Sequence, residues 1–392
     1  MKKSLFALLL GGLTIGITEF VMMGLLPDIA TDLDVSIPVA GYLISAYALG
    51  VVIGAPLLVI AGRNYPPRKM LLLLALMLAG FNALAIIAPS YELLLLSRLL
   101  AGLPHGAFFG VGAVVASKLA DKGKEAQAVS IMFSGLTLAN LLGVPVGTFL
   151  GQLFSWNAAF ILIAAIGVLT VISLYFWMPD LKLEKAHSMR VQLQFFKKKE
   201  AWLIIGITAI GLGGLFCWIS YIAPLLTEVS GFAPEHIPYI LILAGLGMVI
   251  GNIMGGKLAD RFSPPKTILL LLLLIAGDLL LVYFFSSNQY AALALVFLTG
   301  CITFAVAAPI QMLMIQTAVG AEMIASAVIQ AGFNIGNALG AFLGGLPLVA
   351  GFCYASPNLV GVGMALTGVI ITIFFIRGRK AEVRIQEVLV EE

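Results

Sequence analysis

Residues 39–61 read VAGYLISAYALGVVIGAPLLVIA, an apolar stretch without a charged side chain, and a basic segment, Arg63-Asn-Tyr-Pro-Pro-Arg68-Lys69, follows almost directly. A helix needs about 20 apolar residues to cross the ~30 Å hydrocarbon core of a bilayer, because each residue rises ~1.5 Å. The stretch therefore predicts a transmembrane helix that ends in a short basic loop.

The same pattern recurs along the whole chain. Apolar residues make up 61% of the sequence and charged residues 10%, whereas soluble domains are about 45–50% apolar and ~25% charged. We predict an all-α membrane protein with twelve transmembrane helices and no room for a soluble domain. The expected spans are 5–26, 39–61, 70–88, 92–117, 126–153, 157–178, 201–226, 237–259, 267–286, 290–317, 323–350 and 357–376.

The basic residues alternate between loops. If the N-terminus lies inside the cell, every lysine and arginine except Arg98 falls on the cytoplasmic side, and the external loops receive none. Lys and Arg concentrate in the cytoplasmic loops of membrane proteins. We therefore expect a multi-pass protein of the bacterial inner (plasma) membrane with both termini in the cytoplasm.

The chain also resembles itself at an offset of about 197 residues, where Gly50-Val-Val-Ile-Gly54 meets Gly247-Met-Val-Ile-Gly251. Several other glycines and asparagines coincide at the same offset, and they are Gly135, Asn140, Gly143 and Gly147 with Gly332, Asn337, Gly340 and Gly344. The repeat predicts two pseudo-symmetric six-helix bundles, at 1–178 and 201–392 (with a short cytoplasmic tail), joined by a cytoplasmic linker at 179–200. Parallel repeats of this kind place a binding site between the halves.

Three segments also carry a family resemblance. They are Thr18-Glu19-Phe20 with Gly24-Leu-Leu-Pro27, Arg98-Leu-Leu-Ala-Gly102, and Gly143-Val-Pro145-Val-Gly147. Together they resemble the drug:proton antiporter branch of the major facilitator superfamily. Pro104-His-Gly-Ala-Phe-Phe-Gly110 and Ala139-Asn-Leu-Leu-Gly143 resemble its AraJ-like group of sugar and drug efflux proteins. The resemblance implies export by alternating access.

One loop departs from the family pattern, Gly-x-x-x-Asp-Arg-x-x-x-Arg. Gly62 stands where the aspartate belongs, followed by Arg63 and Arg68, whereas the second-half copy keeps Asp260 and Arg261. We expect these four charged residues to act in gating, with Asp260 and helix dipoles replacing the missing acid. Gly143, Pro145 and Gly147 are expected to let the fifth helix bend and move against the eighth helix or the opposite half.

Four ionisable side chains fall inside the spans and away from their ends: Glu19, Arg98, His105 and Asp278. A charge at a helix centre costs about 2.5–3.5 kcal/mol, so each is a candidate for function. We expect Glu19, His105 and Arg98 to act in proton coupling, because a buried carboxylate favours its neutral form and histidine titrates near neutral pH. The alternatives are a structurally paired Glu19, a histidine bonded to a backbone carbonyl, and an Arg98 that fixes packing. Asp278 is expected to be structural.

A second set of residues has side chains suited to a solute, namely amides for hydroxyl groups and aromatic rings for apolar surfaces. The expected substrate-binding residues are Phe20, Phe109, Asn140, Trp218, Tyr221, Asn334 and Asn337. The alternative is that these aromatic residues pack or lie at the membrane interface.

These features predict a proton-coupled antiporter that exports a small organic solute such as a sugar or a drug. A facilitator or a proton-coupled importer of the same fold is the alternative. A membrane enzyme or sensor has less support, because the sequence has no HExxH, GxSxG or P-loop pattern. We expect a monomer whose partners are the solute, protons and the lipid bilayer, without a cofactor, metal or nucleic acid.

Overall fold

The computed structural model describes residues 3–35, 37–181 and 194–391, and all the regular secondary structure in this part of the chain is helical. It contains twelve helices that are long and apolar enough to cross a membrane. All but the seventh coincide with a predicted span to within a few residues, so the predicted fold class is confirmed. Large apolar side chains such as Leu76, Phe176 and Phe374 are exposed on its outer faces, as expected where lipid is the solvent.

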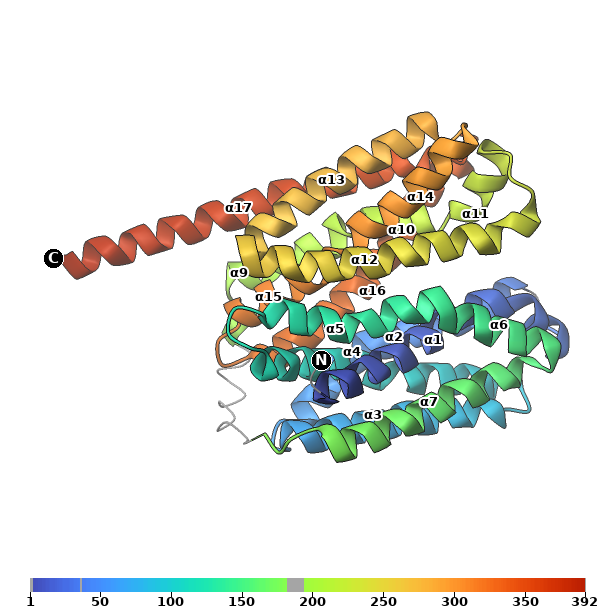
Figure 1. The fold of residues 1–392 in the computed structure, drawn as a ribbon, viewed down its shortest axis with the longest axis horizontal. Helices are drawn as coiled ribbons and strands as arrows, with labels where there is room; N and C mark the ends of the chain where they lie inside the picture. Colours follow the sequence, from blue (N-terminus) through green and yellow to red (C-terminus); the bar gives the residue numbers. More distant parts are fainter. Residues whose placement is uncertain (1–2, 36, 182–193, 392) are drawn as a thin grey trace.

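The first six spans form one bundle, drawn in blue to green in Figure 1. Their fifth member is a single span made of three pieces, of which the middle one is a π-helix. The elements are α1 (Lys3–Asp32), α2 (Ile37–Gly62), α3 (Pro67–Ile86), α4 (Tyr91–Leu119), α5 (Glu125–Leu138), η1 (Ala139–Gly143), α6 (Val144–Leu153) and α7 (Trp156–Trp177).

The last six spans form the second bundle, drawn above the first in Figure 1. Its elements are α9 (Lys199–Gly206), η2 (Ile207–Gly211), α10 (Gly213–Ile219), α11 (Ile222–Pro224), η3 (Leu225–Val229), η4 (Pro234–His236), α12 (Ile237–Phe262), α13 (Pro264–Phe285), α14 (Gln289–Phe304), α15 (Ala307–Thr317), α16 (Glu322–Val349) and α17 (Pro357–Glu391). The seventh span ends earlier than the predicted 201–226. Pro224 explains the break at Ser220, because a proline ring clashes with the carbonyl four residues before it.

The repeat seen in the sequence is a repeat of helix packing. Gly50 and Gly54 of α2 lie against the backbone of α4, where an added Cβ would overlap the backbone of Leu99 or Leu103. Gly247 and Gly251 of α12 lie in the same way against α14. Small residues at this spacing let two backbones approach closely within a membrane, which is why both halves keep them.

The halves meet along α2, α4 and α5 on one side and α12, α15 and α16 on the other. We call this contact the seam, and α5 and α12 lie side by side across it in Figure 1. The domain limits 1–178, 179–200 and 201–392 stay a prediction, and residues 182–193 of the linker lie outside the described part.

The two ends of the bundle differ in charge. At one end α2, α4, α12 and α15 finish and α3, α5, α13 and α16 begin, and the connections there carry residues such as Arg63, Lys122 and Lys124. We call this the basic end, and the opposite one, where Asp32 and Glu235 lie, the acidic end. The charge asymmetry predicts that the basic end faces the cytoplasm.

Cysteine labelling tests this orientation. We expect Tyr290→Cys, at a side chain that is 86% exposed at the acidic end, to react with a membrane-impermeant maleimide on intact cells. Lys122→Cys, exposed at the basic end, should react after the cells are permeabilised. Both variants need a background in which Cys217, Cys301 and Cys353 are replaced. The reverse labelling pattern would contradict the assignment.

Candidate functional site

A buried arginine lies at the centre of the first bundle. Arg98 of α4 is 1% exposed. Its Nη2 donates to the carbonyl oxygen of Thr18 on α1, 2.9 Å away, and its guanidinium carbon lies 4.5 Å from the centre of the Tyr47 ring. Its Nε and Nη1 are buried without a hydrogen-bond partner. The charge is therefore held by one carbonyl and one aromatic face, and part of its hydrogen-bonding capacity is unused.

Tyr47 extends this arrangement to a histidine. The Tyr47 hydroxyl and His105 Nδ1 are 3.0 Å apart and form a buried hydrogen bond. The His105 ring then contacts Phe109 at a centroid distance of 5.4 Å, and Phe109 stacks on Phe133 of α5 at 4.9 Å. Arg98, His105 and Phe109 share one side of α4 because they are seven and four residues apart. Phe109 and Phe133 form what we call the aromatic wall.

Glu19 of α1 follows the residue that binds Arg98, and it is half-buried. Its carboxyl group is close enough to interact electrostatically with both Arg98 and Tyr47. In the described part of the chain, however, no Glu19 oxygen lies within 4.0 Å of an Arg98 nitrogen. An unpaired acid thus lies close to an arginine with unused N–H groups. We call Glu19, Tyr47, Arg98 and His105 the central polar group.

The structure brings together the three residues that the sequence predicted for proton coupling, and their role in coupling stays a prediction. It adds Tyr47, which the sequence reasoning missed. The available signal was a tyrosine near the middle of the apolar stretch 39–61, because a buried tyrosine hydroxyl needs a hydrogen-bond partner.

The halves are joined at the basic end by an aspartate on a helix terminus. The carboxylate of Asp260, on α12, accepts hydrogen bonds from the backbone N–H groups of Ala126 and Gln127 on α5, at 2.9 and 3.0 Å. The first N–H groups of a helix lack internal partners and carry a partial positive charge. A carboxylate from one half is therefore well placed to hold the first turn of a helix in the other.

A second contact across the seam lies two turns away along α12. Asn252 Nδ2 donates to the carbonyl oxygen of Ser130 at 2.8 Å and to Ser134 Oγ at 3.1 Å, and Ser130 Oγ donates to the carbonyl oxygen of Asn252 at 2.6 Å. The sequence reasoning missed Asn252. We call the Asp260 and Asn252 contacts the clasp, and it closes the seam towards the basic end.

A buried amide cluster lies in the second half. Gln330 donates to Gln311 Oε1 at 3.0 Å, Gln311 donates to Ser326 Oγ, and Asn334 Nδ2 donates to the carbonyl oxygen of Gln330 at 3.0 Å. A Cβ added to Gly106 of α4 would lie 3.3 Å from the Gln330 Cβ. The cluster therefore lies at the seam, one residue along α4 from His105, and Asn334 belongs to it.

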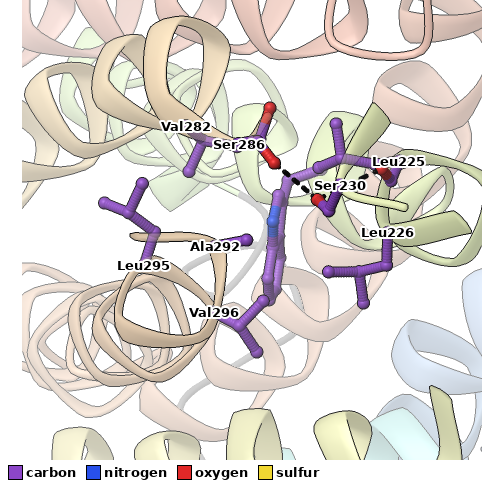
Figure 2. Close-up of a pocket in the computed structure, with 9 residues that line it drawn as sticks. Leu225, Leu226, Ser230, Val282, Ser286, Ala292, Leu295 and Val296 are labelled. Atoms are coloured by element: carbon purple, nitrogen blue, oxygen red, sulfur yellow. Dashed lines mark hydrogen bonds between the residues drawn. The ribbon is translucent and has the colours of Figure 1, made fainter. Parts of the chain in front are cut away.

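Trp218, expected in the substrate path, is 1% exposed inside the second bundle. It lines a small cavity of about 10 Å³ whose other residues come from η3, α13 and α14 and their ends. Figure 2 shows this cavity, with Ser230 hydrogen-bonded to Ser286 among leucine and valine side chains. A role for Trp218 in substrate binding stays a prediction, and in this structure its ring packs inside the second bundle.

The glycines of the fifth span lie against α1, and their role in gating stays a prediction. A Cβ at Gly143 would overlap Ile17, and one at Gly147 would meet Val21 at 2.9 Å, both on α1. These glycines pack within the first bundle and not across the seam, where α5 uses Ser130 and its neighbours. Pro145 is exposed just after the π-helix η1.

Arg68 is held within the first half, by Asp180 at 2.6 Å and the carbonyl oxygen of Tyr175 at 2.5 Å. Arg63 and Arg261 are exposed at the basic end.

Asp278 is buried inside the second bundle, where Thr299 is near it. The remaining predicted substrate residues are half-buried, and they are Phe20, Asn140, Tyr221 and Asn337.

Comparison with known proteins decides the family. The model of the Major Facilitator Superfamily matches residues 8–328. The chain belongs to the major facilitator superfamily. It is therefore a multi-pass membrane transporter that moves a small molecule, and not an enzyme.

Relatives and solved structures agree with this assignment. AraJ of Escherichia coli K12, named as a transporter, is 41% identical over 93% of this chain and 92% of its own. The inner membrane transport protein YdhP of the same organism is 40% identical over 96% of both chains. A chloramphenicol resistance protein of Streptomyces lividans is 31% identical over 89% and 88%. The transporter FucP in its outward conformation has the same fold, with a TM-score of 0.74 at 16% identity over 95% of this chain and 98% of its own.

The clasp predicts the effect of Asp260→Asn. The amide keeps an acceptor but loses the charge, so closure of the basic end should weaken by about 1–2 kcal/mol, roughly a tenfold rise in the open population. Distances between spin labels at Lys122→Cys and Lys257→Cys, one on each half, measure that population. Asp180→Asn is the matched control, because Asp180 pairs with Arg68 within one half. Equal populations in both variants would contradict the role of the clasp.

Proposed function

We propose that this transporter is a proton-coupled antiporter that exports a small organic solute from the cytoplasm across the bacterial inner membrane. The observation that carries the proposal is the unpaired Glu19 beside Arg98, whose Nε and Nη1 are buried without partners. An ionised carboxylate in apolar surroundings would pair with such an arginine, so the separation supports a Glu19 that carries a proton here.

The coupling step follows from this pair. While Glu19 holds a proton it is neutral and stays apart from Arg98. Once the proton leaves, the carboxylate gains from pairing with the unused N–H groups of Arg98, and a rotation of the Glu19 side chain on α1 would bring it there. The two arrangements differ in charge at the centre of the first bundle, so proton binding can shift the equilibrium between conformations.

Alternating access is supported by the clasp. With Asp260 and Asn252 engaged, the halves are held together at the basic end, which we place in the cytoplasm. Opening to the cytoplasm requires these contacts to break, and rocking of one half against the other is the motion known for parallel repeats. Proton and solute would then both bind to a protein that alternates between the same two conformations, with the basic end closed or open.

The energy of one proton is sufficient for export. A charge that crosses 100 mV contributes about 2.3 kcal/mol, which at ~1.36 kcal/mol per decade supports roughly a fifty-fold solute gradient. One Glu19 proton per turnover would therefore drive useful transport.

The solute class is suggested by the groups near the seam. The aromatic wall is buried in this structure and would offer apolar ring faces once the halves part, and amides such as Asn334 and Gln330 would offer hydrogen bonds. Together with the relative named for chloramphenicol resistance, they favour a compact drug-like molecule or a sugar. A facilitator or an importer of the same fold is the second candidate.

Flux in proteoliposomes tests the proposal. The labelled solute is chosen as the sugar or antibiotic that stabilises the purified protein most in a thermal-shift screen. In wild type, an imposed pH gradient should drive uphill transport opposite to the proton flow. Glu19→Gln should lose uphill transport but still equilibrate solute, because the amide cannot exchange a proton.

Asp278→Asn is the matched control, since Asp278 is also a buried acid within a span but lies inside the other bundle. It should keep uphill transport. Full uphill activity in Glu19→Gln would refute the role of Glu19. Wild-type flux that does not depend on the pH gradient would exclude the antiporter and support a facilitator.

A further inference from the structure

Within the central polar group, Tyr47 contacts both Arg98 and His105. The face of its ring lies under Arg98, and its hydroxyl bonds to His105. It is 2% exposed. Arg98 and His105 are on α4 and two turns apart, whereas Tyr47 comes from α2. A single side chain of another helix thus contacts both ionisable residues of α4.

The position of this ring is fixed by helix packing. Gly102 lies on α4 between Arg98 and His105, and a Cβ there would overlap the Tyr47 carbonyl oxygen. The backbones of α2 and α4 are therefore in close contact at the level of the tyrosine. The Tyr47 ring cannot shift relative to Arg98 without a change at this contact or at the bond to His105.

The same helix also reaches the other half. Ala55, two turns after Tyr47 on α2, lies against Gly106, and α2 packs against α16 across the seam. The helix that carries Tyr47 therefore contacts both the central polar group and the other half. The charged and titratable groups that face Tyr47 are Glu19 from α1 and Arg98 and His105 from α4.

We propose that Tyr47 is a positioning residue that links His105 to the Arg98–Glu19 pair. A solute that contacts His105 or Phe109 would change the His105–Tyr47 hydrogen bond, and the Tyr47 ring would pass that change to the guanidinium it supports. Solute and proton would then be linked through one phenol. This inference rests on the proposed function and adds the residue through which its two sites communicate.

The two contacts of Tyr47 can be separated by substitution. Tyr47→Phe keeps the ring under Arg98 and removes the bond to His105. Tyr91→Phe is the matched control, because Tyr91 of α4 donates to the carbonyl oxygen of Val39 on α2 at 2.6 Å. The control removes a tyrosine bond between the same two helices and leaves the central polar group untouched.

The experiment follows opening of the basic end against pH, with spin labels at Lys122→Cys and Lys257→Cys in full-length protein in lipid nanodiscs. Wild type should open and close over a defined pH range. Removing one hydrogen bond should change the proton concentration at the midpoint roughly three- to tenfold in Tyr47→Phe. Tyr91→Phe should keep the wild-type midpoint. His105→Ala breaks the same bond from the other side and should move the midpoint in the same way.

A double-variant cycle decides whether the effect passes through His105. Tyr47→Phe should add nothing in the His105→Ala background, because their shared bond is already lost. An additive effect, or a Tyr47→Phe midpoint equal to that of wild type, would overturn the link alone. Wild-type opening that does not depend on pH would overturn proton coupling as well. His105→Ala gives an independent result if Tyr47→Phe fails to fold.

Discussion

The proposed mechanism depends on one buried positive charge, that of Arg98. Arg98 lies in the middle of a helix bundle, away from water, and a charge there is costly unless other groups compensate it. One carbonyl oxygen and one aromatic face do so incompletely, because two of its nitrogens have no partner. An arginine that is held but not fully paired can respond to a change in charge at Glu19. We regard this incomplete pairing as the basis of the proposed proton coupling.

The helix that carries Arg98, α4, is also one of the helices that form the seam. Glycines bring α2 onto α4 and α12 onto α14 by the same packing in each half, so the helices that meet across the seam are backed by close partners. The clasp is polar, and its hydrogen bonds can exchange with water when the halves part. Close apolar packing within each half and polar contacts between them are what rigid-body rocking requires.

The sequence predicted the twelve spans because their signal is length and hydropathy, which do not depend on tertiary contacts. It predicted Arg98, Glu19 and His105 as candidates because charges inside spans are rare. It could not say which partners Trp218 and Phe109 would contact, since an aromatic side chain in an apolar helix has no directional signal. Asn252 and Tyr47 were missed for a related reason. Their meaning comes from partners more than 50 positions away in the sequence, and the packing that creates those pairs is not visible in local spacing.

The protonation state of Glu19 when the basic end is closed tests the account most directly. Infrared spectroscopy can detect the carbonyl stretch of a protonated carboxyl group in purified protein near neutral pH, under conditions where spin labels report a closed basic end. The account predicts that Glu19→Gln removes a component of this band and that Asp278→Asn, which removes another buried carboxyl group, leaves that component in place. A closed protein whose protonated-carboxyl signal is the same with and without Glu19 would show an ionised Glu19, and would contradict the account.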